Sequence, residues 1–352
     1  MEISSNGKPI YFNLGFNPLL NLIEKNNYSQ VFVLVDEHTS ELCLPILRDG
    51  LGDFQNYSII ETQAGEQHKT IDFCIGIWNT LLDFNADRKS LLINLGGGVV
   101  TDMGGFIAAT FKRGIDFVNI PTTLLSQVDA SVGGKTGIDL DENKNMIGTF
   151  SIPEAVFIES EFLETLPKRE ILSGFAEIIK HGLIADDVLF DQILNSNLES
   201  IHPDLIIKSV TIKNKIVEHD PKEKGLRKIL NFGHTIGHAI ETYSLQNDPQ
   251  PLNHGEAIVV GMLCEAYIST VVNKLTPEEL NIIVDFLLKI YPKYSLEENA
   301  FDQILLTLAY DKKNENHQLM FSLLNRIGDC DFNINVSNEL IIESLNFYQD
   351  LK

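Results

Sequence analysis

Residues 91–102 read LLINLGGGVVTD, and this short stretch decides the fold. The apolar run at 91–95 predicts a buried strand, and the residues that follow the three glycines predict a helix. Glycines at such a junction let the backbone approach a pyrophosphate, which the N-terminus of a helix favours electrostatically. The spacing departs from the G-x-G-x-x-G dinucleotide fingerprint, so a tight strand-to-helix turn without a ligand stays an alternative.

Strands and helices alternate on both sides of that stretch. Residues 31–36, 57–61 and 117–120 are further short apolar runs, and residues 70–84 carry apolar side chains at helical spacing. The alternation predicts a Rossmann-like α/β domain over residues 1–160, with a mostly parallel sheet whose ligands bind beyond the carboxyl ends of the strands. Asp36 ends one run and is a candidate acceptor for a ribose hydroxyl, with a solvent-facing loop aspartate as the alternative.

The remainder of the chain has a different pattern. Helical periodicity dominates residues 161–348, for example at 204–218 and 277–290. We therefore expect a second, all-α domain over residues 161–352 that binds metal and substrate. The cleft between two domains is a common place for an active site.

Composition limits the partners and the location of the protein. The chain has 352 residues, 44% of them hydrophobic, and a net charge of −22, which repels nucleic acid and anionic membranes. Neither a signal peptide nor a run of about 18 apolar residues is found in the sequence. The four cysteines lack C-x-x-C spacing, which favours a reducing cytoplasm over a disulfide or zinc-thiolate scaffold.

Histidines form the strongest local signal. In NFGHTIGH (residues 231–238), His234 and His238 are spaced i, i+4 and project from one face of a helix; His254 lies in a second motif, NHGE. With Glu177 as a carboxylate, two of these histidines would make a common catalytic zinc arrangement, although buried structural histidines are the alternative. Spacing alone does not decide which of His234, His238 and His254 is not a ligand, nor does it exclude His181.

Basic side chains are the next set of candidates. They suit phosphate and carboxylate recognition, although each alone is also compatible with a solvated surface charge; they are Arg113, Lys135, Lys144, Lys180, Lys213, Arg227 and Lys312. The tripeptide at 134–136 (GKT) resembles the end of a phosphate-binding P-loop, but Asp129 stands where that loop needs a glycine, which argues against an ATPase.

Taken together, these segments resemble the 3-dehydroquinate synthase family of sugar phosphate cyclases over nearly the whole chain and in the expected order. The matching segments are GEQHK (65–69), GGG (96–98) with Asp102, RGI (113–115), PTTLLSQVDASVGGKTG (121–137), KN (144–145), AE (176–177) with Lys180, 223–227, NFGHTIGH (231–238), HGE (254–256) and DKK (311–313). Two departures are Thr101, where many members have glycine, and a longer segment between His238 and His254.

The resemblance implies roles for individual residues. The metal ligands are Glu177, His234 and His254, for zinc or cobalt, whereas His238 contacts substrate and assists proton transfer. NAD is held by Asp36, Glu66, Lys69, Gly97, Gly98, Asp102, Thr122, Thr123, Lys135, Lys144 and Thr165. Substrate is contacted by Asp129, Lys135, Lys144, Asn145, Lys180, Lys213, Arg227, Asn231 and Lys312, with Glu223 as a candidate for orienting a lysine. Arg113 reaches the phosphate in the neighbouring subunit's site, which implies a homodimer.

The implied reaction converts 3-deoxy-D-arabino-heptulosonate 7-phosphate to 3-dehydroquinate by transient oxidation, phosphate elimination, re-reduction and aldol closure. Rivals are another cyclase, such as 2-deoxy-scyllo-inosose synthase or a sedoheptulose 7-phosphate cyclase, and a metal-dependent alcohol dehydrogenase. Arg227, Asn231 and His238 together favour the heptulosonate, since its carboxylate needs a partner. A non-catalytic NAD-binding protein would lack a ligand or a lysine, and none is missing.

Overall fold

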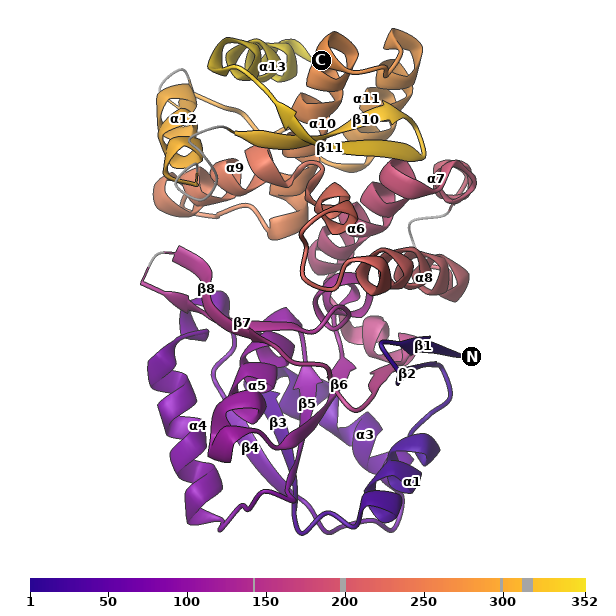
Figure 1. The fold of residues 1–352 in the computed structure, drawn as a ribbon, viewed down its shortest axis with the longest axis vertical. Helices are drawn as coiled ribbons and strands as arrows, with labels where there is room; N and C mark the ends of the chain where they lie inside the picture. The colour runs from indigo at the N-terminus through magenta and orange to yellow at the C-terminus, as the bar shows by residue number, and fades with distance from the viewer. Residues whose placement is uncertain (142, 197–200, 298–299, 312–318) are drawn as a thin grey trace. The chain divides into compact units, whose positions relative to one another are not determined.

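The computed structural model describes residues 1–141, 143–196, 201–297, 300–311 and 319–352. They form two compact units, Met1–Pro167 and Lys168–Lys352 (Figure 1). The boundary at residue 160 that the sequence predicts falls within a short helix of the first unit, η4 (Ser160–Thr165).

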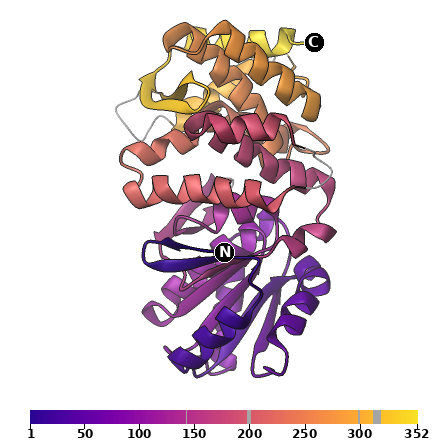
Figure 2. The ribbon, with the colours of Figure 1, turned by 90° about the vertical axis from the view of Figure 1, so that its right-hand side faces the viewer.

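A seven-stranded sheet forms the centre of the first unit (Figure 2). Its strand order is β1-β2-β9-β6-β5-β3-β4, and every neighbouring pair is parallel except β1 and β2. The strands are β1 (Glu2–Ser5), β2 (Lys8–Phe12), β3 (Val31–Asp36), β4 (Ser58–Thr62), β5 (Leu91–Gly96), β6 (Asp116–Pro121) and β9 (Val156–Ile158). The mostly parallel sheet expected from the alternating pattern is confirmed.

Both faces of this sheet are covered by helices because the residues of its central strands are mainly apolar and buried. In β3, Val31, Val33 and Val35 pack on one side with α1 and α3, whereas Phe32 and Leu34 pack on the other side with α4 and α5 (Figure 1). A strand buried on both faces reads as a continuous hydrophobic run. The helices are α1 (Asn17–Asn26), α2 (Glu37–Leu42), α3 (Leu44–Leu51), α4 (Ile71–Asp83) and α5 (Gly98–Thr110).

The first unit also contains a two-stranded antiparallel sheet and short helical turns. The hairpin strands are β7 (Lys135–Leu140) and β8 (Asn143–Phe150), and β7 packs against α5. The turns are η1 (Glu66–His68), η2 (Phe111–Arg113), η3 (Ser126–Ala130) and η4. Both predicted phosphate-binding lysines of this unit, Lys135 and Lys144, therefore lie on the hairpin rather than on the main sheet.

The second unit is mainly helical, as its periodicity predicts. Its helices are α6 (Lys168–Ala185), α7 (Asp187–Leu194), α8 (Pro203–His219), η5 (Leu226–Asn231), α9 (His234–Asn247), α10 (His254–Val272), α11 (Pro277–Ile290), α12 (Ala300–Asp311) and α13 (Asn338–Asp350). One hairpin, β10 (Met320–Arg326) with β11 (Asp329–Asn335), lies in a stretch for which we expected only helix. The expectation of an entirely α second domain is corrected on this point.

Helix α10 is the centre of the second unit. It packs against α6, α9, α11 and α13, and it is apolar on all sides, as expected for a helix buried all round. Among the described residues it is the one helix that is long and apolar enough to cross a membrane. However, 72% of its apolar 18-residue segment is buried inside the protein. Its apolar character is therefore that of a core helix.

Candidate functional site

The carboxyl ends of three neighbouring strands carry the predicted NAD residues of the first unit. Asp36 ends β3, Gly97 and Gly98 follow β5, and Thr122 and Thr123 follow β6, which pairs with β5 up to Gly96 and Pro121. Gly97 caps the N-terminus of α5, and a Cβ there would lie 3.0 Å from the Thr123 side chain. Free N–H groups at the end of a 13-residue helix, approachable through glycine, suit a pyrophosphate.

Asp36 also has a structural role that the sequence did not indicate. It is the N-cap of α2: its Oδ1 accepts a hydrogen bond from the Thr39 backbone N–H at 2.8 Å, and Thr39 Oγ1 lies 2.9 Å from the Asp36 N–H. A capping box of this kind holds the carboxylate in one orientation at the sheet edge.

Lys69 connects two groups of predicted site residues in the first unit. Its ammonium donates hydrogen bonds to Asp102 Oδ2 and to Asn145 Oδ1, both at 2.7 Å, and lies 3.7 Å from Glu66 Oε1. Burial would lower the pKa of Lys69, but Asp102 and Glu66 outweigh it and raise the pKa. Lys69 is thus a charged lysine that joins η1, α5 and β8.

The backbone at Asn145 is fixed from a second side. Its N–H donates to Asp139 Oδ1 at 2.6 Å, and its φ of 55° lies in the left-handed region, which asparagine tolerates better than most residues. The remaining candidates of this unit are distributed over other segments. Asp129 is in η3, and the exposed candidates are Arg113, Lys135, Lys144 and Thr165. Lys312 lies outside the described residues.

In the second unit, three helices place the histidines next to Glu177. Glu177 is on α6, His234 and His238 are on α9, and His254 is the first residue of α10. Glu177 Oε1 lies 3.5 Å from His234 Nε2 and 3.8 Å from His254 Nε2. The three imidazole rings lie within 5.7 Å of one another, centroid to centroid.

The two separations from Glu177 Oε1 to the histidine nitrogens are compatible with ligands of one tetrahedral metal ion. Bond lengths of about 2.0–2.2 Å to nitrogen and oxygen place neighbouring tetrahedral ligands about 3.4 Å apart. Glu177 is fully buried, and within the described part of the chain no hydrogen bond reaches its Oε1. A buried carboxylate oxygen directed at two imidazole nitrogens at this separation has the surroundings of a ligand.

Both histidines next to Glu177 have their other ring nitrogen engaged. His234 Nδ1 lies 3.1 Å from the carbonyl oxygen of Phe232, and His254 Nδ1 lies 3.3 Å from Glu241 Oε2. A proton on Nδ1 would leave the Nε2 lone pair free for a metal ion, which is the usual outer-shell arrangement of histidine ligands. His238 completes an all-histidine group with His234 and His254, but it is exposed whereas Glu177 is buried. Burial thus favours Glu177 over His238 as the third ligand.

The charges around Glu177 are consistent with metal binding. Burial would raise the pKa of Glu177, but Lys180, which forms an ion pair with its Oε2, and the two histidines hold the pKa well below its usual value. Burial, with Lys180, lowers the pKa of His234, so this imidazole is neutral. Burial also acts to lower the pKa of His254, but Glu177 and Glu241 outweigh it and raise the pKa to about 9.

A separate polar group in this unit contains the predicted carboxylate-binding residues. Arg227 and Lys213 are buried at 3% and 5% exposure, and Arg227 Nη1 donates to the Pro221 carbonyl at 2.8 Å. Asn231 Nδ2 donates to Glu223 Oε1 at 2.9 Å. Glu223 therefore has an amide partner in Asn231. The predicted role of Glu223 in orienting a lysine stays a prediction.

Comparison with known proteins identifies the family. The 3-dehydroquinate synthase N-terminal model matches residues 59–173, and the C-terminal model matches residues 174–314. A 3-dehydroquinate synthase of Parabacteroides distasonis is 42% identical over 336 residues, which cover 94% of this chain and 95% of that protein. The chain belongs to the 3-dehydroquinate synthase family.

Solved structures of two sugar phosphate cyclases are similar to the whole chain at 25% identity. One is 2-epi-5-epi-valiolone synthase from Streptomyces hygroscopicus with NAD+ and Zn2+ bound, with a TM-score of 0.87 over 100% of this chain and 98% of that one. The other is 2-deoxy-scyllo-inosose synthase complexed with carbaglucose-6-phosphate, NAD+ and Co2+, with a TM-score of 0.84 over 97% and 98%. The predicted fold class of the family is confirmed.

The contacts of three carboxylates in the second unit were not predicted from the sequence. Glu241 contacts His254, Glu256 caps α10, and Glu265, fully buried, accepts hydrogen bonds from the Gly233 and Ile236 N–H groups at the start of α9. Glu241 follows His234 and His238 at i+7 and i+3, a helical face that could have revealed it. Asn253 and Glu256 have the spacing of a capping box, a signal that was also readable.

Proposed function

We propose that this member of the family converts 3-deoxy-D-arabino-heptulosonate 7-phosphate to 3-dehydroquinate and phosphate, using NAD and one divalent ion, zinc or cobalt. The observation that carries the proposal is the approach of His234 and His254 to the buried Glu177, in a chain 42% identical to a 3-dehydroquinate synthase. The cyclases of similar structure were solved with NAD+ and either Zn2+ or Co2+, which supports both cofactors.

The proposed metal site uses the two imidazoles and the carboxylate as ligands. Phe232 and Glu241 hold the two rings so that each Nε2 faces Glu177, and Lys180 fixes the other carboxylate oxygen. When bound, NAD supplies reversible hydride exchange and the divalent ion supplies Lewis-acid chemistry. His238 is exposed beside the ligands and is proposed to move a proton to or from substrate rather than to bind the ion.

NAD is proposed to bind at the sheet edge of the first unit. The pyrophosphate would lie at the N-terminus of α5, next to Gly97 and Gly98, and Asp36 would accept hydrogen bonds from a ribose. Glu66, Lys69 and Asp102 would line the same site, with Lys69 kept charged by the two carboxylates. Thr122, Thr123 and Thr165 complete the proposed set.

Substrate contacts are assigned to cationic and amide groups. The phosphate is assigned to Lys135, Lys144, Asn145, Lys312 and the partner subunit's Arg113, and the carboxylate to Arg227 with Lys213. Asp129, Lys180, Asn231 and Glu223 are proposed to orient these groups and the substrate hydroxyls. Fixing the substrate in this way lets its own phosphate take part in proton transfer, so that geometry supplies much of the catalysis.

The assembly and location follow from the same proposal. A homodimer is needed if Arg113 serves the neighbouring site, and its exposed guanidinium makes no hydrogen bond or ion pair with the described residues of its own chain. A cytoplasmic location is supported by four cysteines that are free and buried.

Phosphate release tests the proposed function. The purified chain, given the heptulosonate phosphate with NAD and Co2+, should release one phosphate per molecule of substrate and accumulate no NADH. A chelator or omission of NAD should stop the release. Net NADH formation would indicate a dehydrogenase instead, and faster phosphate release from glucose 6-phosphate or sedoheptulose 7-phosphate would indicate another cyclase.

A further inference from the structure

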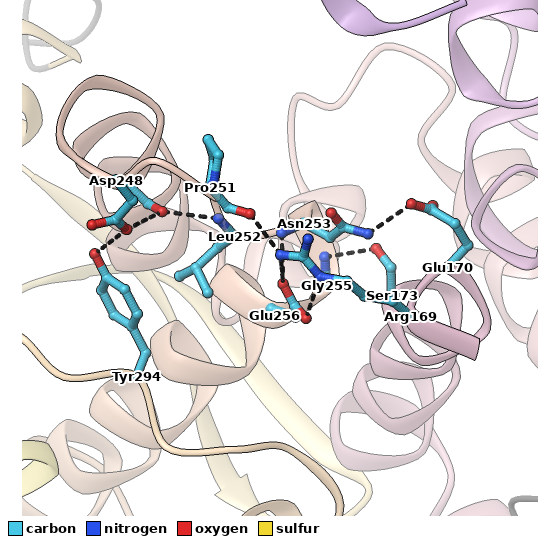
Figure 3. A network of polar contacts seen from close by, with 11 residues as sticks. Arg169, Glu170, Ser173, Asp248, Pro251, Leu252, Asn253, Gly255, Glu256 and Tyr294 are labelled. Atoms are coloured by element: carbon cyan, nitrogen blue, oxygen red, sulfur yellow. Dashed lines mark hydrogen bonds and ion pairs between the residues drawn. The ribbon is translucent and has the colours of Figure 1, made fainter. Parts of the chain in front are cut away.

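A network of polar contacts joins the start of α6 to the start of α10 (Figure 3). Arg169 lies at its centre: Nε donates to Glu256 Oε1 at 2.9 Å, and Nη2 donates to Glu256 Oε2 and to the Pro251 carbonyl, both at 2.6 Å. A guanidinium bound to both oxygens of a carboxylate is the most directional ion pair that side chains form. This contact therefore fixes orientation as well as distance.

Further contacts tie the same two helices together. Asn253 Nδ2 donates to Glu170 Oε1 at 2.7 Å, and the Gly255 N–H donates to Ser173 Oγ at 3.0 Å. The helices touch through their backbones here, since a Cβ on Gly255 would overlap the Ser173 carbonyl oxygen and lie 2.5 Å from its Cα. The glycine of the HGE motif is thus required by the close approach of α6.

The segment before α10 is held at its other end as well. Ser244 Oγ donates to Asp248 Oδ2 at 2.6 Å and accepts from the Leu252 N–H at 2.8 Å, while Tyr294 Oη donates to the same Asp248 oxygen at 2.7 Å (Figure 3). The segment from Asp248 to Asn253 is therefore pinned on both sides of the Arg169 contact.

This network is placed where it can set the spacing of two proposed metal ligands. Glu177 lies one helical turn beyond Ser173 on α6, and His254 lies between Asn253 and Gly255. A movement of α10 along α6 would change the 3.8 Å separation of Glu177 Oε1 and His254 Nε2 directly. Ligand sets tolerate displacements of only about 0.5 Å.

We propose that Arg169 and Glu256 are positioning residues, whose ion pair holds His254 at ligand distance from Glu177. The inference rests on the metal site of the proposed function. Neither residue would touch the ion or the substrate, so removing the pair should weaken metal binding without altering the ligands themselves.

Metal affinity of the full-length chain tests this role. Competition between the metal-free protein and a chelator for Co2+ gives a dissociation constant, and the visible Co2+ bands report ligand geometry. We expect Arg169→Met and Glu256→Gln to bind Co2+ about 10–100-fold more weakly, with altered bands, and Arg169→Lys to recover part of the loss. The double variant should lose less affinity than the two single losses combined, because the ion pair is common to both.

Controls separate this role from general stability. Arg326→Met removes an exposed ion pair of the same unit, 3.9 Å from Asp187, and should leave Co2+ affinity unchanged. Wild-type Co2+ affinity in Arg169→Met, or the same loss in Arg326→Met, would overturn the inference. Failure of the wild-type chain to bind Co2+, or binding unaffected by Glu177→Gln, would instead overturn the proposed metal site.

Discussion

At the scale of single residues, the main fact is a fully buried carboxylate that has not been neutralised by protonation. Glu177 has 0% exposure, and isolated charges are costly to bury. Lys180 compensates one oxygen, and the other faces two imidazoles, one of which, His254, is cationic because its pKa is about 9. The positive charge of protonated His254 therefore balances part of the negative charge of Glu177 in the metal-free protein.

Metal binding should therefore release a proton from His254. At pH 7 this imidazole is protonated in the metal-free protein, whereas a ligand must be neutral; Glu177 and His234 already have the required charge states. We expect about one proton to be released per Co2+ and the affinity to rise about tenfold per pH unit up to pH 9. Calorimetric titration in two buffers of different ionisation enthalpy measures the release. No proton release at pH 7 would contradict the charge state assigned to His254.

Glu265 should make the stability of the protein depend on pH. Burial raises its pKa to about 8 from 4.5, although backbone N–H donors act in the opposite direction. Between these values the folded chain holds a proton that the unfolded chain has lost, so the free energy of unfolding falls as pH rises, at up to about 1.4 kcal/mol per pH unit.

Glu265→Gln should remove this slope. Denaturant unfolding of both proteins from pH 5 to 8 measures the free energy of unfolding. As pH rises, this free energy should increase for the variant relative to the wild type. Parallel curves would mean that the N–H donors of α9 keep Glu265 ionised throughout.

At the scale of elements, α9 and α10 cross with almost no space between their backbones. A Cβ on Gly261 of α10 would overlap the Gly233 carbonyl oxygen and lie 2.7 Å from the Gly237 nitrogen. Gly233, directly before α9, and Gly237, on α9, lie on either side of His234. The helix crossing therefore helps to fix the position of this proposed ligand. Glycine normally weakens a helix, and its presence inside α10 is explained by this contact.

Gly261→Ala should destabilise the protein by about 1–3 kcal/mol through overpacking, even though alanine is the better helix former. Gly76→Ala on α4 is the matched control, because nothing lies within 4 Å of a Cβ there. The control should stabilise the protein by about 0.5–1 kcal/mol. The midpoint of urea unfolding measures both, and a stabilised Gly261→Ala would show that the helices separate freely.

The elements also show how far the sequence alone could lead. Residues 31–36 and 277–290 match β3 and α11, because buried strands and amphipathic helices have strong local patterns. The β10–β11 hairpin, which packs on α10 and η5, was missed although it has two local signs: the alternating sequence DCDFNIN at residues 329–335 and a two-residue turn with Gly328 at φ 86°.

The candidate site divides in the same way. Glycines and histidines in short motifs pointed to Gly97, His234 and His254, and resemblance supplied the choice of Glu177. Arg169 and Glu265 could not be found, because a single charged residue in a helix has the same local pattern whether it faces solvent or a buried partner. Which of these it faces is decided by a segment distant in the sequence.

At the scale of the whole molecule, an acidic protein has to attract an anionic substrate. The net charge is −22, yet Lys180, Lys213 and Arg227 are almost completely buried in the second unit. Charges buried in a medium of low dielectric constant act more strongly than surface charges, which salt screens. We therefore expect local cations of this kind to bind the phosphate and carboxylate of the substrate, although the net charge of the chain is negative.

Subunit complementation tests the last element of the proposed function, the use of Arg113 by the neighbouring site. Arg113→Ala and Glu177→Gln homodimers should each be nearly inactive. In a mixed dimer, one site combines an intact Glu177 with the partner subunit's Arg113, and the other site lacks both. Random pairing makes half of the dimers mixed, with one active site in each, so co-expressed variants should recover about a quarter of wild-type phosphate release. If Arg113 served its own site, every site in the mixture would lack one residue, and no activity would return. When each homodimer is nearly inactive, the recovered activity therefore depends only on which chain supplies the guanidinium.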